Sequence, residues 1–85
     1  MSTNPDPSQR SDDQIVTLLS HWLTRQLGND ELRRKVEEIG TEDLAPGQRT
    51  AVRELLAGLQ DAPPGERGQL EVTVRETVET LVYGD

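Results

Sequence analysis

The chain of 85 residues contains no cysteine and a single histidine, His21. Disulfide bonds are therefore excluded, and a structural zinc site would lack the thiolate and imidazole ligands that zinc usually binds. Phenylalanine is also absent, and Trp22 and Tyr83 are the only aromatic residues. A chain of this size buries only about 60–65% of the surface that its unfolded form exposes. We therefore expect a small core that is supplemented by association with a partner.

Basic residues are scarce. Nine of them stand against sixteen acidic residues, which gives a formal net charge of −7. Because proteins bind phosphate groups with matched cations, this balance argues against a nucleic-acid partner and against an anionic membrane partner. A basic protein surface is still compatible with it.

Long hydrophobic runs are missing as well. No stretch approaches the roughly 18 apolar residues that a transmembrane helix needs. The opening MSTNPDPSQRSDD lacks the order of basic and then apolar residues that a signal peptide has. We therefore expect a soluble, cytoplasmic protein with no membrane partner.

The chain divides into a tail and one domain. Residues 1–10 carry two prolines and two serines and no large apolar residue after Met1, so nothing there offsets the entropy of ordering. We predict a disordered tail over 1–10 and a single helical domain over 11–85.

The segment 11–27 has the apolar spacing of a helix, with Ser11 as a cap residue and acidic Asp12 and Asp13 at the positive end of the helix dipole. Gly28 follows and suits the left-handed conformation that ends a helix. At about 100° per residue the apolar side chains cover half of the circumference, which is more than one packed stripe needs. The helix therefore either sits centrally in the domain or meets another chain with part of this surface. These side chains are Ile15, Val16, Leu18, Leu19, Trp22, Leu23 and Leu27.

A second helix is expected over 30–39. Asn29 or Asp30 can cap it, and Gly40 can end it. Its apolar residues form a narrow stripe, and oppositely charged residues recur at a spacing of four, which is typical of a solvated outer face. The expected pairs are Glu31–Lys35, Arg33–Glu37 and Arg34–Glu38.

A third helix is expected over 46–60. Pro46 suits the first helical position because it has no amide hydrogen to leave unpaired, and Gln48 can cap the helix by bonding back to the backbone. The run QDAPPGERG over 60–68 then breaks the chain.

The segment 68–83 carries two competing patterns. Leu70, Val72 and Val74 alternate with polar residues, which is a strand pattern. The alternation fails at Glu76, and a strand would have no partner, whereas the helical stripe persists to the end. We predict a helix that leaves Val72 on its outer face, and an all-α, small four-helix bundle for the whole domain. The stripe consists of Leu70, Val74, Thr77, Val78 and Leu81.

His21 is the first candidate for chemistry. A catalytic histidine needs an orienting carboxylate and a nucleophile or metal within reach, and the neighbouring hydroxyls of Thr17 and Thr24 have no activating partner. Helical di-metal sites use a Glu-x-x-His pair, but Leu18 stands three residues before His21. We interpret His21 as structural or solvated, and we predict no catalytic residue, no metal site and no cofactor.

Arg33, Arg34 and Lys35 form the only cluster of cations. On a helix, three adjacent residues spread over about 200°, and acidic residues follow them at a spacing of four. This pattern is more typical of a solvated face than of a phosphate site. The segment APPGERG likewise lacks the lysine of a phosphate-binding loop.

The wide apolar surface of 11–27 carries the interface prediction. Trp22 is most simply a core anchor, although tryptophan is also enriched in interface hot spots. Ile15 and Leu19 point to the middle of the apolar surface and should hold the core. Other apolar residues run along one flank at spacings of seven and four, where they could meet a second copy or another protein. The predicted interface residues are Val16, Trp22, Leu23 and Leu27.

Three hypotheses about function follow. The first is a small acidic, cytoplasmic, helical protein–protein interaction module, such as an accessory subunit, adaptor or regulator, that is not an enzyme. The second is an acidic decoy or nucleic-acid mimic that binds a basic protein surface, and its affinity would fall steeply with salt. The third is an enzyme with a site built across subunits, which a deep pocket lined by His21 and converging carboxylates would favour.

Overall fold

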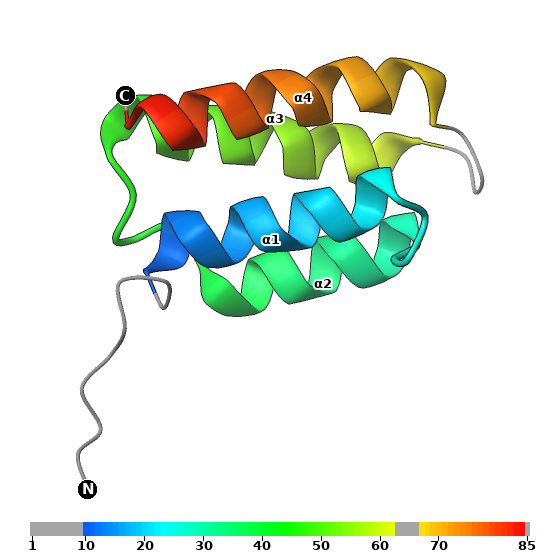
Figure 1. The fold of residues 1–85 in the computed structure, drawn as a ribbon, viewed down its shortest axis with the longest axis horizontal. Coiled ribbons are helices and arrows are strands. Elements are labelled where there is room, and N and C mark those ends of the chain that lie inside the picture. The colour runs from blue at the N-terminus through cyan, green and yellow to red at the C-terminus, as the bar shows by residue number, and fades with distance from the viewer. Residues whose placement is uncertain (1–9, 63–66, 85) are drawn as a thin grey trace, which may run out of the picture.

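The computed structural model describes residues 10–62 and 67–84. These residues form four helices and no strand (Figure 1), so the predicted all-α four-helix bundle is confirmed. The helix over the last segment is confirmed against the strand alternative. The predicted tail over 1–10 lies outside the described residues except for Arg10, which is the N-cap residue of the first helix. The helices are α1 (Ser11–Leu23), α2 (Asn29–Ile39), α3 (Pro46–Asp61) and α4 (Gly68–Tyr83).

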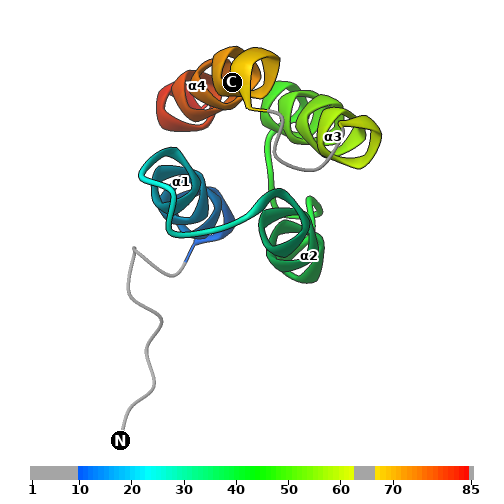
Figure 2. The same ribbon diagram turned by 90° about the vertical axis from the view of Figure 1, so that its right-hand side faces the viewer.

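The helices run alternately up and down, and α1 and α3 point the same way in Figure 1. Seen end-on, they form a ring in which each helix packs against two neighbours (Figure 2). The neighbouring pairs are α1–α2, α2–α3, α3–α4 and α1–α4. The start of α1 therefore lies at the same end of the bundle as the end of α4. No helix in the described ranges is long and apolar enough to cross a membrane.

The core lies inside this ring. Ile15, Leu19 and Trp22 of α1 are 0% exposed, which confirms that the middle of the apolar surface of α1 faces the core. Each of the other helices contributes one buried stripe at helical spacing, and the connector between α2 and α3 adds a leucine. The remaining apolar core residues are Leu32, Val36, Leu44, Val52, Leu55, Leu59, Leu70, Val74 and Leu81.

The predicted helix over 11–27 is wrong in its last four residues. Arg25 has a φ of 67°, in the left-handed region, and ends the helix. The amide of Gln26 donates to the carbonyl of His21 at 2.8 Å, and the amide of Arg25 donates to the carbonyl of Trp22 at 3.0 Å. This pair of bonds is the Schellman motif that closes many helices, here with arginine in place of glycine.

The prediction that Gly28 stops the first helix is also wrong. Gly28 has an extended backbone, with φ −84° and ψ 173°, and it is the N-cap residue of α2. Asn29, which we predicted as a cap, is the first residue of α2. The left-handed residue lies three positions earlier than the sequence indicates.

Arg67, the N-cap residue of α4, joins α4 to the end of α1 and to the connector that follows it. Its guanidinium donates to the carbonyl of Trp22 at 2.7 Å and to the carbonyl of Leu27 at 2.8 Å. It also stacks over the Trp22 ring, with its Cζ atom 4.2 Å from the ring centroid. Trp22 in turn donates its indole Nε1–H to Oδ1 of Asn29 at 2.7 Å. The bonds from Arg67 add a second donor to the carbonyl of Trp22 and tie the carbonyl of Leu27, beyond the end of α1, to the start of α4.

Gln48 organises the opposite end. Its Oε1 accepts the amide of Ala45 at 2.9 Å, which confirms the predicted back-capping of α3 behind Pro46. Its Nε2 donates to the carbonyl of Leu81 at 3.0 Å, so the side chain also ties the start of α3 to the end of α4. Gln48 is 4% exposed, and both ends of its amide are paired.

The connector between α2 and α3 is held from α3. Arg49 donates to the carbonyls of Thr41 and Leu44, in each case at 3.3 Å. Ser11 was predicted to cap α1 but is its first helical residue, and its hydroxyl faces Asp43 of the connector at 3.5 Å. The connector therefore packs against the start of both α1 and α3.

Candidate binding surface

The structure separates the four predicted interface residues. Trp22 is 0% exposed and lies in the core, so its side chain offers no surface to a partner. Val16, Leu23 and Leu27 are half-buried and pack against the core from its edge. Val16 and Leu23 lie two turns apart on one side of α1, whereas Leu27 follows the end of the helix and no longer extends that side.

The breadth of the apolar surface of α1 has a simple cause in the ring. α1 packs against α2 on one side and α4 on the other, so it needs apolar residues on both flanks of its buried stripe. Leu18 on one flank and Val16 and Leu23 on the other are all half-buried against the core. Much of the surface that suggested an interface is therefore used within the chain.

The candidates for chemistry stay apart. His21 is exposed, and the described residues contain no group of three or more histidine or acidic side chains that could hold a metal ion. On α2, Arg33 lies 3.6 Å from Glu37, one of the ion pairs expected from the sequence. Arg34 is exposed, and Lys35 is half-buried.

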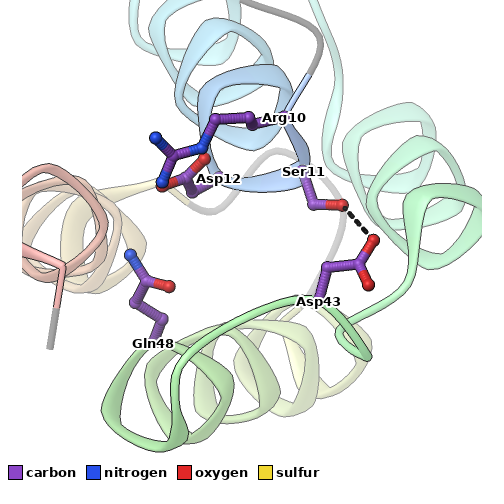
Figure 3. A pocket seen from close by; sticks show the side chains of 5 residues that line it. All are labelled: Arg10, Ser11, Asp12, Asp43 and Gln48. Carbon is purple, nitrogen blue, oxygen red and sulfur yellow. Dashed lines mark hydrogen bonds and ion pairs between the residues drawn. The ribbon is translucent and has the colours of Figure 1, made fainter. Parts of the chain in front are cut away.

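A shallow hollow of about 260 Å³ opens at the end of the bundle near Gln48 (Figure 3). The polar groups around it pair with one another: Arg10 lies 3.1 Å from Asp12, and Ser11 faces Asp43 across the hollow. No buried side-chain nitrogen or oxygen in the described part of the chain lacks a partner. The hollow therefore presents no unpaired buried group to a ligand, and His21 is not part of its lining.

Large apolar side chains are exposed at three positions of the described residues, and all three belong to α4. Val72 is 51% exposed, Val82 is 66% exposed and Tyr83 is 79% exposed. The exposure of Val72 agrees with its predicted place on the outer face. Val82 and Tyr83 were not singled out from the sequence, although their place just after the last buried residue of the stripe, Leu81, is visible there.

Helical geometry places two of these three residues, Val72 and Tyr83, on the same side of α4. At about 100° per residue, Val72, Glu76, Glu79 and Tyr83 lie within about 60° of one another, on the side of α4 opposite its buried stripe. We call these four residues the outer face of α4. Both glutamates are exposed, so the face has an apolar residue at each end and two carboxylates between them.

The corresponding sides of the other helices carry no large apolar residue. They are polar apart from one alanine and Pro46 at the start of α3, and all of their residues are exposed. α4 is therefore the helix whose outward side differs from an ordinary solvated surface. The residues on these other outward sides are Asp13, Thr17 and Ser20 of α1, Asp30, Arg34 and Glu37 of α2, and Pro46, Thr50, Glu54, Ala57 and Asp61 of α3.

Comparison with known proteins gives no further assignment: no family model, no curated protein and no solved structure matches the chain.

Proposed function

We propose that this protein is a small acidic, cytoplasmic, helical module that acts by binding another protein, as an accessory subunit, adaptor or regulator rather than as an enzyme. The observation that carries the proposal is the concentration of exposed apolar side chains on α4, at Val72, Val82 and Tyr83. Tyrosine is enriched among the residues that dominate binding energy, and its ring brings a large apolar area together with a hydrogen-bonding hydroxyl.

The small core supports the same proposal. Burial of apolar surface contributes about 25 cal/mol per Å², so covering half-exposed valines and a largely exposed tyrosine stabilises a complex without any change in the fold. The four helices form a closed ring, so no other helix of the ring covers the outward side of α4. A partner that covers α4 would add to the limited stability of a chain this small.

An acidic decoy is the second candidate, and the net charge of −7 favours it. A decoy would bind through many dispersed carboxylates, so its affinity would fall steeply between low and high salt. Binding through the apolar residues of α4 would change little over the same range.

Self-association is the other form that the proposed binding can take. Val16 and Leu23 lie at the edge of the core on α1 and keep part of their surface exposed. If they meet a second copy, Leu23→Glu converts a dimer into a helical monomer, which sedimentation and circular dichroism measure together. A wild-type chain that stays monomeric at high concentration would limit the proposal to a different protein as partner.

The main test compares three tagged proteins in extracts of the native host. The first is the wild-type chain, the second carries Val72→Ser and Tyr83→Ser, and the third carries matched exposed substitutions on other helices, Thr17→Ser and Ala57→Ser. We expect one protein, identified by mass spectrometry, that the wild-type chain and the third protein retain and the second protein loses. The interaction is then rebuilt from the two purified proteins. Equal retention by all three, or retention of nothing, contradicts the proposal.

A further inference from the structure

We infer that the outer face of α4 is a docking site for a basic amphipathic helix of a different protein. This inference rests on the proposed function and adds the chemistry of the partner. The partner helix would place apolar side chains against Val72 and Tyr83, and lysine or arginine against Glu76 and Glu79.

The spacing of the outer face fits a helix. Its residues follow one another at intervals of four, three and four, which is the alternation of the a and d positions in a coiled-coil heptad, whose full repeat averages 3.5 residues. Two helices that share this period stay in contact over several turns when they cross at about 20°. Val72 and Tyr83 are eleven residues apart, or about 16 Å along the axis, so a partner of three turns covers the whole face.

The backbone of α4 also favours a helical partner over an extended one. Strand addition needs a row of unpaired backbone groups, as at the edge of a sheet. The described residues form no strand, and α4 is a continuous helix from Gly68 to Tyr83. Affinity must therefore come from side chains on a convex surface, and a second helix presents them at the matching period.

Charge complementarity selects a basic partner. Glu76 and Glu79 stand between the two apolar residues and are exposed. An apolar partner would remove water from both carboxylates without replacing their hydrogen bonds, which is unfavourable. A partner with cations at these two positions pairs them, and the net charge of −7 attracts it at long range. Arg75 lies on the edge of the face, about 60° from Val72, where it contacts only the rim of such a partner.

The same arrangement disfavours a second copy of this chain. In an antiparallel pairing of two α4 helices, Val72 lies opposite Tyr83 of the second copy and Glu76 lies opposite its Glu79. In a parallel pairing each glutamate lies opposite its own equivalent. Both arrangements put like charges in contact, which is destabilising. The occupant of this face is therefore a different protein.

The test uses synthetic helical peptides with leucine, lysine, lysine and leucine at successive spacings of four, three and four. Because short isolated helices are marginal in water, each peptide carries a hydrocarbon staple on its opposite face. An acidic twin has glutamate in place of the two lysines. A fluorescent label at one end allows binding to the purified full chain to be measured by anisotropy.

Two variants with equal net charge separate a specific face from general acidity. Glu76→Lys with Glu79→Lys reverses the charge of the outer face of α4. Glu31→Lys with Glu38→Lys reverses two exposed carboxylates of α2, which lie seven residues apart on one side of their helix. Circular dichroism first confirms that both variants keep the wild-type helicity.

We expect the basic peptide to bind the wild-type chain and to lose about tenfold or more in affinity for the α4 variant, which corresponds to about 1.4 kcal/mol. Its affinity for the α2 variant should stay within about threefold of the wild type, because that change acts only through screened long-range attraction. The acidic twin should bind the α4 variant more tightly than the wild type.

Equal losses with both variants would overturn the inference, because the peptide would then be responding to net charge alone. No measurable binding of the basic peptide at about 1 mM would also overturn it. The proposed function fails separately. A distinct result is that the basic peptide fails to bind while the Val72→Ser and Tyr83→Ser protein still loses an identified partner. That result would support the proposed binding module and contradict the inference that its partner is a basic helix.

Discussion

The two ends of the bundle are closed by different chemistry. At one end the cation of Arg67 stacks on Trp22 and binds two backbone carbonyls. At the other end the neutral amide of Gln48 joins an amide of the connector to the last buried turn of α4. We call these the arginine end and the glutamine end.

A polar side chain contributes to stability according to what its loss leaves behind. Arg67 is half-buried and bonds its carbonyls at 2.7 and 2.8 Å, within the short range of charge-assisted hydrogen bonds. Gln48 donates at 3.0 Å but is only 4% exposed. Water can take the place of the Arg67 guanidinium at its part-buried carbonyls, whereas the buried carbonyl of Leu81 would be left without a donor if Gln48 were lost. We therefore expect the loss of the Gln48 side chain to lower the free energy of unfolding more than the loss of the Arg67 guanidinium, although the hydrogen bonds of Gln48 are longer.

We expect the largest loss of stability from a change to Trp22, the apolar residue of the arginine end. Trp22→Ala removes the largest fully buried side chain, and such truncations cost about 3–5 kcal/mol. Because a chain this small is stable by only a few kcal/mol, the variant should lose most of its helical signal in circular dichroism at 25 °C. Trp22→Phe keeps most of the volume and should stay folded. A folded Trp22→Ala protein would show that the core tolerates the loss.

The next effect concerns the glutamine end. Gln48→Met preserves the shape of the side chain but leaves the amide of Ala45 and the carbonyl of Leu81 without their partner. We expect a loss of about 2–3 kcal/mol in the free energy of unfolding, measured with urea. Gln48→Glu keeps the acceptor for Ala45 but removes the donor to Leu81 and places a carboxylate at a 4% exposed position, so we expect it to be no more stable than Gln48→Met. A loss below that of the matched change at Arg67 would reverse the comparison between the two ends.

At the arginine end the matched change is Arg67→Met, which keeps the apolar stem and removes the guanidinium. Water can reach the freed carbonyls, so we expect a smaller loss of about 1–2 kcal/mol. Arg67→Lys should recover only part of it, because an ammonium cannot stack and bind two carbonyls as a flat fork does. Urea unfolding of the three proteins measures the difference. Full recovery by lysine would mean that charge alone matters.

The smallest effect should be a gain. Arg25 is exposed and holds a φ of 67°, which costs an ordinary L-residue about 1 kcal/mol. Arg25→Gly removes this strain at the position where helices commonly end in glycine, so we expect about 0.5–1 kcal/mol more stability. Thermal unfolding should shift upward by a few degrees. Arg25→Ala, which keeps the Cβ atom, should show no such gain.

The buried stripes were predictable because helix periodicity is a local property. Ile15 and Leu19 on α1 and Val74 and Leu81 on α4 follow from spacing alone, and all are buried. The back-capping by Gln48 was predictable for the same reason, since its partner Ala45 lies three residues away.

The end of α1 was not predictable in this way. Gly28 matched the local signal for a helix end, but Arg25 takes the left-handed conformation. The bond from Arg67 to the carbonyl of Trp22 joins residues 45 positions apart, and no local pattern encodes such a contact. The candidate site was predictable in part: helical spacing placed Val72 outside the buried stripe and puts Tyr83 on the same side, but it does not show whether another helix covers that side.

The order of the helices around the ring has a consequence for the speed of folding. Three of the four packed pairs join helices that follow one another in the chain, and only α1–α4 joins distant segments. Such local topologies fold in microseconds to milliseconds. We expect the α1–α4 contact, with Arg67 on Trp22, to form after the rate-limiting step. Arg67→Met should then accelerate unfolding and leave refolding unchanged, as followed by stopped-flow fluorescence of Trp22, the only tryptophan. Slower refolding would instead place this contact in the folding nucleus, so that closing the ring would limit the rate.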